Sequence, residues 1–294
     1  MASNPLRYAY YPGCSMHGTA QEYQQSIDAV CGALDVELIE IADWNCCGAS
    51  SAHGANDVLS AALPARNLAM AHKMGIDVAV PCAACFNRLA TANLRIREDS
   101  DLRARVNETL AQDYDGSVRV RPLADAVIND VGIEAIQAKV SRPLEGLKVA
   151  CYYGCLMVRP PEAVAFDRPE NPQALDRLVG ALGAKSVDWP HKTECCGASF
   201  SLTRTDIVLK LTGDVLKMAK RCGADCVICA CPLCMANLDM RQAEIERISG
   251  EKLGLPILYF TELMGLAMGL PGAQSWLKKH MVSSDSLLKS PVAL

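Results

Sequence analysis

The sequence has few aromatic residues, no long apolar run and no cluster of basic residues. Aromatic side chains make up only 5% of the 294 residues, although half of all residues are hydrophobic. The net charge is −4 and no Lys/Arg block occurs, so nothing suits the phosphate backbone of a nucleic acid. The longest apolar stretch near the C-terminus contains Glu262 and Pro271 and is shorter than the ~20 residues of a membrane-spanning helix. We expect a globular protein with no nucleic-acid partner and no transmembrane segment.

A secretory signal is also missing from the N-terminus. The stretch "MASNPLRYAYYPGC" contains no apolar run of about 7–15 residues behind a basic start. We therefore expect a cytoplasmic location, where glutathione and thioredoxin keep thiols reduced. In such a compartment the fifteen cysteines of the chain indicate metal or redox chemistry more than structural disulfides.

Most of these cysteines belong to an internal repeat. The stretch "LRYAYYPGCSM" resembles "LKVACYYGCLM", "ADWNCCGAS" resembles "HKTECCGAS", and "VAVPCAACFNRL" resembles "VICACPLCMANL". The interval from Cys47 to Cys82 equals that from Cys196 to Cys231, each being 35 residues. Chance rarely reproduces such an interval between two cysteine motifs, so the repeat predicts two homologous domains.

The boundary between the two domains is expected in the stretch "VSRPLEG". Pro143 and Gly146 mark a turn there, directly before the first strand of the second repeat. We therefore divide the chain into an N-terminal domain of residues 1–143 and a C-terminal domain of residues 144–294.

Within each repeat, short β-branched runs alternate with helical patterns. Residues 36–43 and 76–82 have the composition of buried strands, whereas 55–75 and 205–223 carry apolar residues at helical spacing. The two helices place Asp57 and Asp206 in their first turns, and each ends in a basic residue and a glycine. Residues 120–132 and 259–270 are predicted to form the closing strand and helix of each repeat. In the first helix, Pro64 predicts a kink or a break.

The alternation of strands and helices predicts an α/β fold in which each domain is a small, mostly parallel sheet flanked by helices. Each repeat has the pattern C-x31–39-CCG-x33-C-x2-C, and its cysteines come at or just after strand ends. The carboxyl ends of parallel strands meet at one edge of a sheet. Five thiolates per repeat are therefore expected in one pocket.

The number five favours a multinuclear iron–sulfur centre over zinc. A structural zinc and a cubane [4Fe-4S] cluster each take four ligands. Adjacent cysteines have Cα atoms 3.8 Å apart, which fits two neighbouring irons better than one tetrahedral ion. Gly48 and Gly197 allow the backbone to approach the inorganic core and to take a positive φ. Zinc in a site stays the alternative.

Five further cysteines break the repeat and are expected to be small core residues: Cys31, Cys151, Cys222, Cys226 and Cys229. One of them, Cys151, competes with Cys155 as the first ligand of the second site. The match of "PGC" with "YGC" favours Cys155.

The repeated cysteine pattern resembles the CCG domain, and the chain from Leu6 to about His280 resembles the B subunit of heterodisulfide reductases. The stretches "YYGCLMVRP" and "YFTELMGLAMGL" are typical of that subunit. The resemblance implies a non-cubane [4Fe-4S] cluster with five cysteine ligands in each domain. The N-terminal ligands would be Cys14, Cys46, Cys47, Cys82 and Cys85. The C-terminal ligands would be Cys155, Cys195, Cys196, Cys231 and Cys234.

The resemblance also implies a reaction and partners. A disulfide between two facing clusters would be cleaved, each sulfur being captured by an iron before electrons arrive one at a time. A ferredoxin-like C subunit with cubane clusters would supply the electrons, fed by a flavoprotein A subunit. The chain itself contains no C-x2-C-x2-C-x3-C-P signature and no G-x-G-x-x-G fingerprint, which agrees with dependence on other subunits.

Polar residues near the predicted ligands are candidates for handling the substrate. They are His17, His53, His191, Lys192 and Arg159. A cationic side chain could hold an anionic group of a thiol substrate, and a histidine could donate the proton that each leaving thiolate needs.

The sequence leaves several interpretations open. The reaction could run toward disulfide reduction or toward oxidation of sulfur on a carrier protein, and composition favours the sulfur-oxidising form slightly. A second interpretation is an electron-transfer or docking subunit of a lactate-utilisation or succinate/fumarate oxidoreductase complex. A third is a zinc-stapled scaffold, in which the second cysteine of each CCG would have no role.

Overall fold

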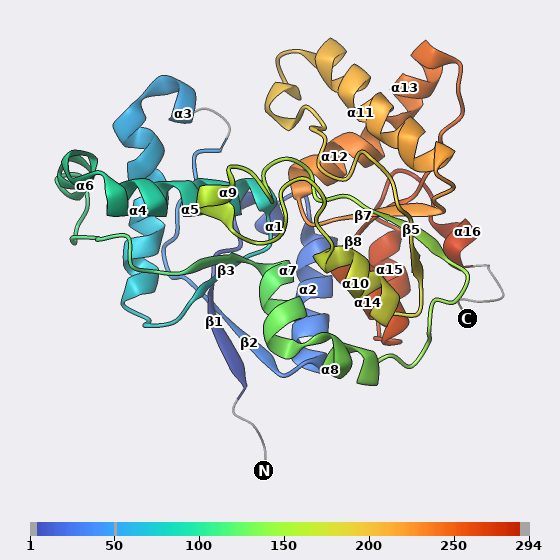
Figure 1. Ribbon diagram of the computed structural model, residues 1–294, viewed down its shortest axis with the longest axis horizontal. Coiled ribbons are helices and arrows are strands. Elements are labelled where there is room, and N and C mark those ends of the chain that lie inside the picture. The colour runs from blue at the N-terminus through green and yellow to red at the C-terminus, as the bar shows by residue number, and fades with distance from the viewer. Residues whose placement is uncertain (1–4, 50–51, 289–294) are drawn as a thin grey trace.

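Two parallel sheets with the same strand order form the framework of the computed structural model, which describes residues 5–49 and 52–288 (Figure 1). The N-terminal sheet has the order β2-β1-β3-β4 and the C-terminal sheet the order β6-β5-β7-β8. All strand pairs are parallel, for example with Val78 opposite Val120 and Val227 opposite Ile257. The central strands β3 and β7 are buried throughout, and β1 and β5 are buried in their carboxyl-terminal parts, because helices cover them. The predicted α/β fold with an internal repeat is confirmed.

The N-terminal domain contains the following elements. Its strands are β1 (Leu6–Tyr10), β2 (Val36–Glu40), β3 (Val78–Val80) and β4 (Val120–Pro122). Its helices are α1 (Cys14–His17), α2 (Gln21–Ala33), α3 (Ala52–Ala55), α4 (Asp57–His72), α5 (Ala83–Glu98), α6 (Ser100–Asn107), α7 (Leu123–Asp125), the π-helical η1 (Ala126–Val131) and α8 (Ile133–Ala138).

The C-terminal domain repeats this order, with a 3₁₀ turn where the N-terminal domain has α3. Its strands are β5 (Lys148–Cys151), β6 (Lys185–Ser186), β7 (Cys226–Cys229) and β8 (Ile257–Tyr259). Its helices are α9 (Pro161–Val164), α10 (Ala174–Ala181), the 3₁₀ turn η2 (Ala198–Phe200), α11 (Thr205–Arg221), α12 (Pro232–Met240), α13 (Gln242–Ser249), α14 (Phe260–Ala267), α15 (Ala273–Leu277) and α16 (Asp285–Leu288). None of the helices within the described ranges is both long and apolar enough to cross a membrane.

The predicted helices lie close to their expected positions. Asp57 and Asp206 lie in the first turns of α4 and α11, as expected from the helix dipole. Of the kink or break expected at Pro64, the break is wrong, because α4 continues through that residue from Asp57 to His72. Pro64 is buried and removes only one hydrogen bond, so packing of the surrounding apolar side chains keeps the helix intact.

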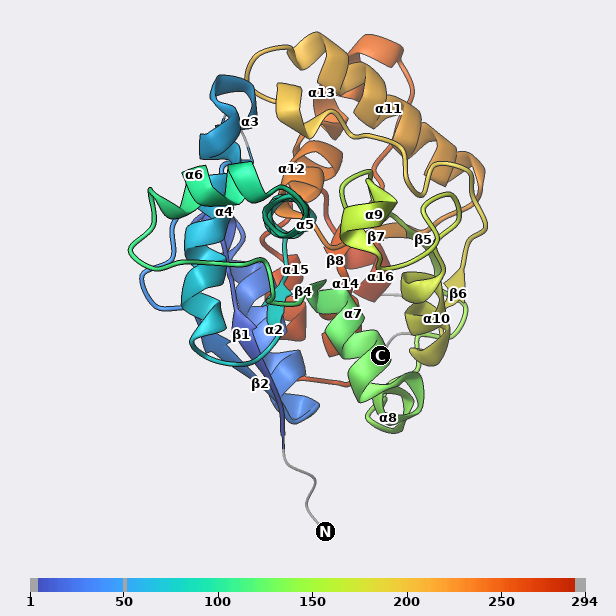
Figure 2. The same ribbon diagram turned by 60° about the vertical axis from the view of Figure 1, so that its left-hand side comes forward.

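The two domains are joined because helices near the end of each domain pack on a helix near the start of the other. Helix α14 of the C-terminal domain packs on α2 of the N-terminal domain, while η1 and α8 pack on α10 (Figures 1 and 2). Tyr23 stacks on Tyr259 with ring centroids 3.8 Å apart, and the hydroxyls of Ser26 and Thr261 are 2.6 Å apart. These contacts are buried, so they fix the domains relative to each other.

The domain boundary between residues 143 and 144 stays a prediction. It is supported by the Leu144 backbone amide, which donates to the Leu182 carbonyl of the second domain.

Candidate metal centre

The repeated cysteines lie at the carboxyl ends of the parallel strands. Cys14 begins α1 shortly after β1, and Cys46 and Cys47 lie in the loop after β2. Cys82 is the residue before α5, and Cys85 lies in its first turn. The second repeat places Cys155, Cys195, Cys196, Cys231 and Cys234 in the same relation to β5, β6 and α12. This is the edge where parallel α/β sheets hold their ligands.

Seven of these thiols form a continuous row of neighbours. The Sγ atoms of Cys47 and Cys85 are 3.3 Å apart, and those of Cys196 and Cys234 are 3.6 Å apart. Further hydrogen bonds connect Cys46 with Cys47, Cys82 with Cys85, and Cys231 with Cys234. The row therefore extends from the first CCG motif to the second.

The row crosses the domain junction at its centre. The Sγ atoms of Cys82 and Cys231 are 4.0 Å apart, although 149 residues separate them in the chain. Next to them, the Ala83 amide donates to the Ala230 carbonyl at 3.3 Å. The two cysteine sets thus face each other and touch.

The second set takes Cys155, and Cys151 points elsewhere. The Cys155 thiol donates to Cys195, which it therefore joins at the edge of the sheet. Cys151 is fully buried on β5, where its Sγ lies 3.6 Å from the Ser186 hydroxyl. Cys14 is exposed at the start of α1.

Two equivalent tyrosines hold the CCG loops. The Tyr11 hydroxyl donates to the Asn45 carbonyl at 2.8 Å, and the Tyr152 hydroxyl donates to the Glu194 carbonyl at 2.6 Å. Each accepting residue comes directly before the paired cysteines. Burial, and then the nearby thiolates, raise the pKa of both phenols well above its ordinary value. Both tyrosines stay neutral donors, so each can keep its loop in place.

Glycine next to the first ligand leaves room for sulfur. Gly13 and Gly154 have φ values of 72° and 66°, and an added Cβ would lie 3.0 Å and 3.4 Å from the Sγ atoms of Cys85 and Cys234. The glycine of each CCG motif also has a positive φ, as predicted. A side chain at these positions would fill the space around the thiols.

Hydrogen bonds between thiols favour ionisation of one member of each set. Hydrogen bonding with Cys46 and then with Cys85 lowers the pKa of Cys47 to about 3. Donation by Cys155 lowers the pKa of Cys195 to about 6. The thiolate is the form of cysteine that binds metal, so each set contains a thiol disposed to the form that a metal would need.

The donor set fits an iron–sulfur centre. All ten donors are thiols, which are the usual ligands of such clusters, and the backbone around them is free of Cβ atoms where sulfur approaches. Among the described residues, no three cysteine, histidine or acidic side chains converge on a point that would suit a single metal ion. The thiols instead follow one another in a row, so a centre that spans several ligands suits them better than a single ion.

The five cysteines outside the repeat lie away from this row. Four of them are buried in the core, as expected, and Cys222 is half-buried: Cys31, Cys151, Cys226, Cys229 and Cys222. Burial raises the pKa of the Cys226 thiol well above its ordinary value, so this side chain stays neutral and inert.

The predicted substrate-handling histidines lie in different surroundings. His17 is exposed, stacks on Trp44 and lies 3.2 Å from Glu40. His53 is exposed on α3. His191 stacks on Trp189, and its buried Nδ1 has no hydrogen-bond partner among the described residues.

Lys192 is turned away from the thiols. Its ammonium group lies 2.7 Å from Asp176 and donates to the Pro172 carbonyl, and the side chain is buried. The Lys192 carbonyl accepts from the amides of Tyr153 and Gly154. The side chain therefore holds the chain around the second set and is not open to a substrate.

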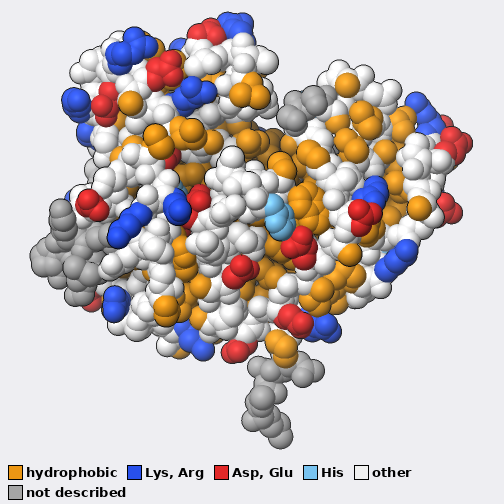
Figure 3. Space-filling view, turned by 180° about the vertical axis from the view of Figure 1, so that it is seen from behind, with side chains coloured by type: hydrophobic (Ala, Val, Ile, Leu, Met, Phe, Trp, Pro, Cys, Tyr) orange, Lys and Arg blue, Asp and Glu red, His pale blue; other side chains and the backbone are white. Residues whose placement is uncertain are grey.

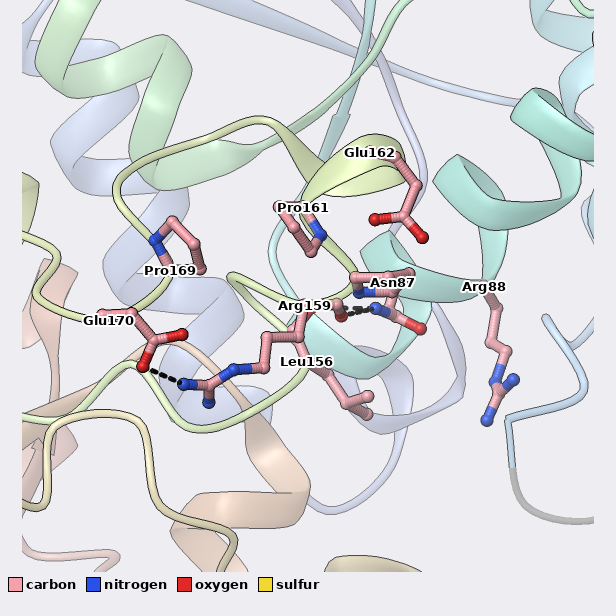
Figure 4. Close-up of a pocket in the computed structure, with 9 residues that line it drawn as sticks. Asn87, Arg88, Leu156, Arg159, Pro161, Glu162, Pro169 and Glu170 are labelled. Atoms are coloured by element: carbon pink, nitrogen blue, oxygen red, sulfur yellow. Dashed lines mark hydrogen bonds and ion pairs between the residues drawn. The ribbon is translucent and has the colours of Figure 1, made fainter.

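Arg159 lines an open cavity at the domain junction, of about 620 Å³ (Figure 4). The other residues of its wall are Asn87, Arg88, Leu156, Pro160, Pro161, Glu162, Pro169 and Glu170. Arg159 pairs with Glu170 at 3.1 Å, and Asn87 of α5 donates to the carbonyls of Leu156 and Arg159. A side chain of the first domain thus holds the loop that follows Cys155. From behind, the surface is also hollowed between the two lobes, with hydrophobic side chains in the hollow (Figure 3).

Sequence reasoning missed Arg88, which lies one turn after Cys85 on α5. Its buried Nε has no hydrogen-bond partner among the described residues, and its charge lowers the pKa of Cys47. In Figure 4 it extends from α5 away from Arg159. The only sequence signal was its position three residues after the last ligand, where the second repeat has Asn237.

Comparison with known proteins agrees with this architecture. A solved structure of a hypothetical protein from Helicobacter pylori shares the fold with a TM-score of 0.73 at 14% identity, covering 96% of this chain and 53% of that one. A protein named 8-methylmenaquinol:fumarate reductase membrane anchor subunit, from Wolinella succinogenes, is 32% identical, covering 95% of this chain and 98% of its own.

Components of heterodisulfide reductases are also similar. The B subunit of the ferredoxin/F(420)H(2)-dependent CoB-CoM heterodisulfide reductase of Methanosarcina acetivorans is 27% identical, covering 96% of each chain. A protein of Archaeoglobus profundus, named as similar to the B subunit of heterodisulfide reductase, is 27% identical, covering 90% of this chain and 91% of its own. The family model of the cysteine-rich CCG domain matches residues 8–90 and 149–239. This chain therefore belongs to the CCG cysteine-rich domain family and carries two copies of that domain.

Proposed function

We propose that the protein is the catalytic iron–sulfur subunit of a heterodisulfide reductase-type complex. It would cleave or form a disulfide, or a carrier-bound sulfur species, between two non-cubane [4Fe-4S] clusters. The ligands would be Cys14, Cys46, Cys47, Cys82 and Cys85 for one cluster and Cys155, Cys195, Cys196, Cys231 and Cys234 for the other. When bound, such clusters would supply one-electron transfer and iron sites with affinity for sulfur.

One observation carries this proposal. The thiol sets of the two domains meet at the 4.0 Å contact between Cys82 and Cys231. Cleavage of a disulfide consumes two electrons and two protons and yields two thiols. Two one-electron centres on either side of one substrate would meet that demand without release of a thiyl radical.

The residues of this chain would bind and orient the substrate. Arg159 faces the cavity beside Cys155 and would hold an anionic group of a thiol. Tyr11 and Tyr152 hold the CCG loops by their donations to backbone carbonyls. His17 is exposed three residues after Cys14 and would give a proton to a departing thiolate.

The proposal includes partner proteins. The relatives from Methanosarcina acetivorans and Archaeoglobus profundus are, by name, components of larger assemblies or similar to them. A ferredoxin-like C subunit with cubane clusters and a flavoprotein A subunit would exchange electrons with this chain. A thiol, a disulfide or a sulfur-carrier protein would be the substrate. The cytoplasmic location that the thiol content favours stays a prediction.

A second function is favoured by the relative from Wolinella succinogenes. Its 32% identity is higher than the 27% of the heterodisulfide reductase relatives. The chain would then be an electron-transfer or docking subunit of a succinate/fumarate oxidoreductase complex, with the same cysteine ligands and no disulfide chemistry.

One experiment separates these functions. Iron, acid-labile sulfide and zinc are measured per chain on anaerobically purified protein. EPR spectra are then recorded with and without dithiodiglycolate, a small dicarboxylate disulfide, and an oxidant. About eight irons and a signal that depends on the disulfide or its thiol would support the disulfide function. About eight irons without such a signal would favour the electron-transfer subunit, and zinc without iron would overturn both.

A further inference from the structure

Several cations in the loops and helices that carry the cysteine motifs have an acidic partner. In the C-terminal domain the pairs are Arg159 with Glu170, Lys192 with Asp176, Arg204 with Asp206, and Arg241 with Glu244. In the N-terminal domain Arg66 pairs with Asp43 and Arg95 with Asp57. Arg88 has no acidic partner within 4.0 Å among the described residues.

Arg88 is held close to the first thiol set. It lies on α5 three residues after Cys85, and side chains at this spacing are neighbours on one face of a helix. The guanidinium is half-buried and its Nε is cut off from water without a partner among the described residues. A charge in such surroundings is screened less than one on the open surface.

The equivalent position in the second domain carries no charge. Asn237 lies three residues after Cys234, as Arg88 lies three residues after Cys85. Its side chain is fully engaged, since it donates to the Cys196 carbonyl at 3.0 Å and accepts from the Ser201 hydroxyl at 2.9 Å. The equivalent position is thus a cation, Arg88, in the N-terminal domain and a neutral amide, Asn237, in the C-terminal domain.

We propose that Arg88 makes the two iron–sulfur centres unequal, raising the reduction potential of the N-terminal centre above that of the C-terminal one. The inference rests on the proposed function only in that both domains hold a cluster. Adding an electron makes a thiolate-bound centre more negative, and an adjacent uncompensated cation favours that state. The first electron to enter the chain would therefore stay on the N-terminal centre. A unit charge on the order of 10 Å away, at an effective dielectric of about 20, changes an equilibrium constant roughly tenfold.

The test is a redox titration of the anaerobically purified full chain, followed by EPR, for the wild type and three variants. Arg88→Gln removes the charge, Arg88→Lys keeps it, and Arg97→Gln removes an exposed charge from the same helix, nine residues further on. Arg88→Gln is expected to lower the potential of one centre by about 59 mV, which corresponds to a tenfold change for one electron. Arg88→Lys and Arg97→Gln are expected to leave both potentials near those of the wild type.

Iron is measured in the same samples, so that failure of the inference about Arg88 can be distinguished from failure of the proposed function. Normal iron with no shift in Arg88→Gln, or with an equal shift of both centres, would overturn the role of Arg88 and leave the proposed function standing. Wild-type protein without iron would overturn the proposed function and this inference together. A shift confined to one centre and restored by lysine would support the inference.

Discussion

Six residues separate Cys14 from α2, whereas eighteen separate Cys155 from α10. Apart from this longer loop, the two CCG domains bring their thiols to the sheet edge in the same way. Each has a tyrosine hydroxyl on the carbonyl before the CCG motif and a positive-φ glycine before the first ligand. The two domains therefore position their cysteines by the same structural features.

The surroundings of the thiols differ between the domains. In the C-terminal domain the longer loop carries Arg159 and lines the cavity, and Lys192 is buried against Asp176. In the N-terminal domain Arg88 follows Cys85 by one turn of α5 and has no acidic partner among the described residues. The two domains keep the cysteines at equivalent positions. They differ in the loop and in the charged residues around those cysteines.

The largest expected effect is a loss of iron when a cysteine ligand of one domain is replaced. Cys47→Ser and Cys196→Ser should each reduce iron from about eight to about four per chain, because each removes a ligand from only one set. Iron and sulfide analysis measures this. Cys222→Ala, at a half-buried cysteine outside both sets, should keep all iron. Loss of all iron from either ligand variant would mean that the two centres form only together.

A second comparison concerns charge pairs at equivalent positions, three residues before each CCG motif. Lys192→Met should lower the free energy of unfolding by about 3–5 kcal/mol, since it leaves Asp176 as a buried charge without its partner. Asp43→Asn, which breaks the exposed pair with Arg66, should cost about 0–1 kcal/mol. Chemical denaturation measures both, and equal costs would contradict the difference in burial.

The tyrosines test the symmetry of the two domains. Tyr11→Phe and Tyr152→Phe should each cost about 1–2 kcal/mol, because each removes a tyrosine donation to a carbonyl of the CCG loop. The Asn45 carbonyl keeps a second donor, the Asn67 side-chain amide at 3.0 Å, so the cost of Tyr11→Phe should lie at the lower end. Equivalent effects in thermal and chemical unfolding would support a shared role. A large effect in only one domain would show that the other loop is held by different contacts.

The smallest expected effect concerns the loop found only in the C-terminal domain. Asn87→Ala removes two donations to that loop and should cost about 1 kcal/mol, with faster hydrogen exchange in residues 156–173. Gln137→Ala, which removes an exposed amide from α8, should leave exchange in the loop unchanged. Unchanged exchange in Asn87→Ala would mean that the loop is held by its other contacts.

The fold and the ligand spacing could be predicted because they depend on local pattern. The β-branched runs became β2 and β3, the helical patterns became α4 and α11, and the cysteines came after strand ends. Pro64 misled the helix prediction because burial of the helix outweighs one lost hydrogen bond. Lys192 was a reasonable candidate by its position, but nothing local revealed that Asp176 would be its partner.

The sequence by itself determined the duplication, the parallel α/β architecture and the order of the thiols, since periodicity and spacing act within each repeat. Only the tertiary structure decided how the two repeats meet. The contact between Cys82 and Cys231, the pairing of Lys192 and the isolation of Arg88 join or separate residues far apart in the chain. These contacts form only when the buried helices of one domain pack on the other. Dense packing permits few such arrangements, and a buried charge without a partner is costly, so the tertiary structure decides which charges are paired.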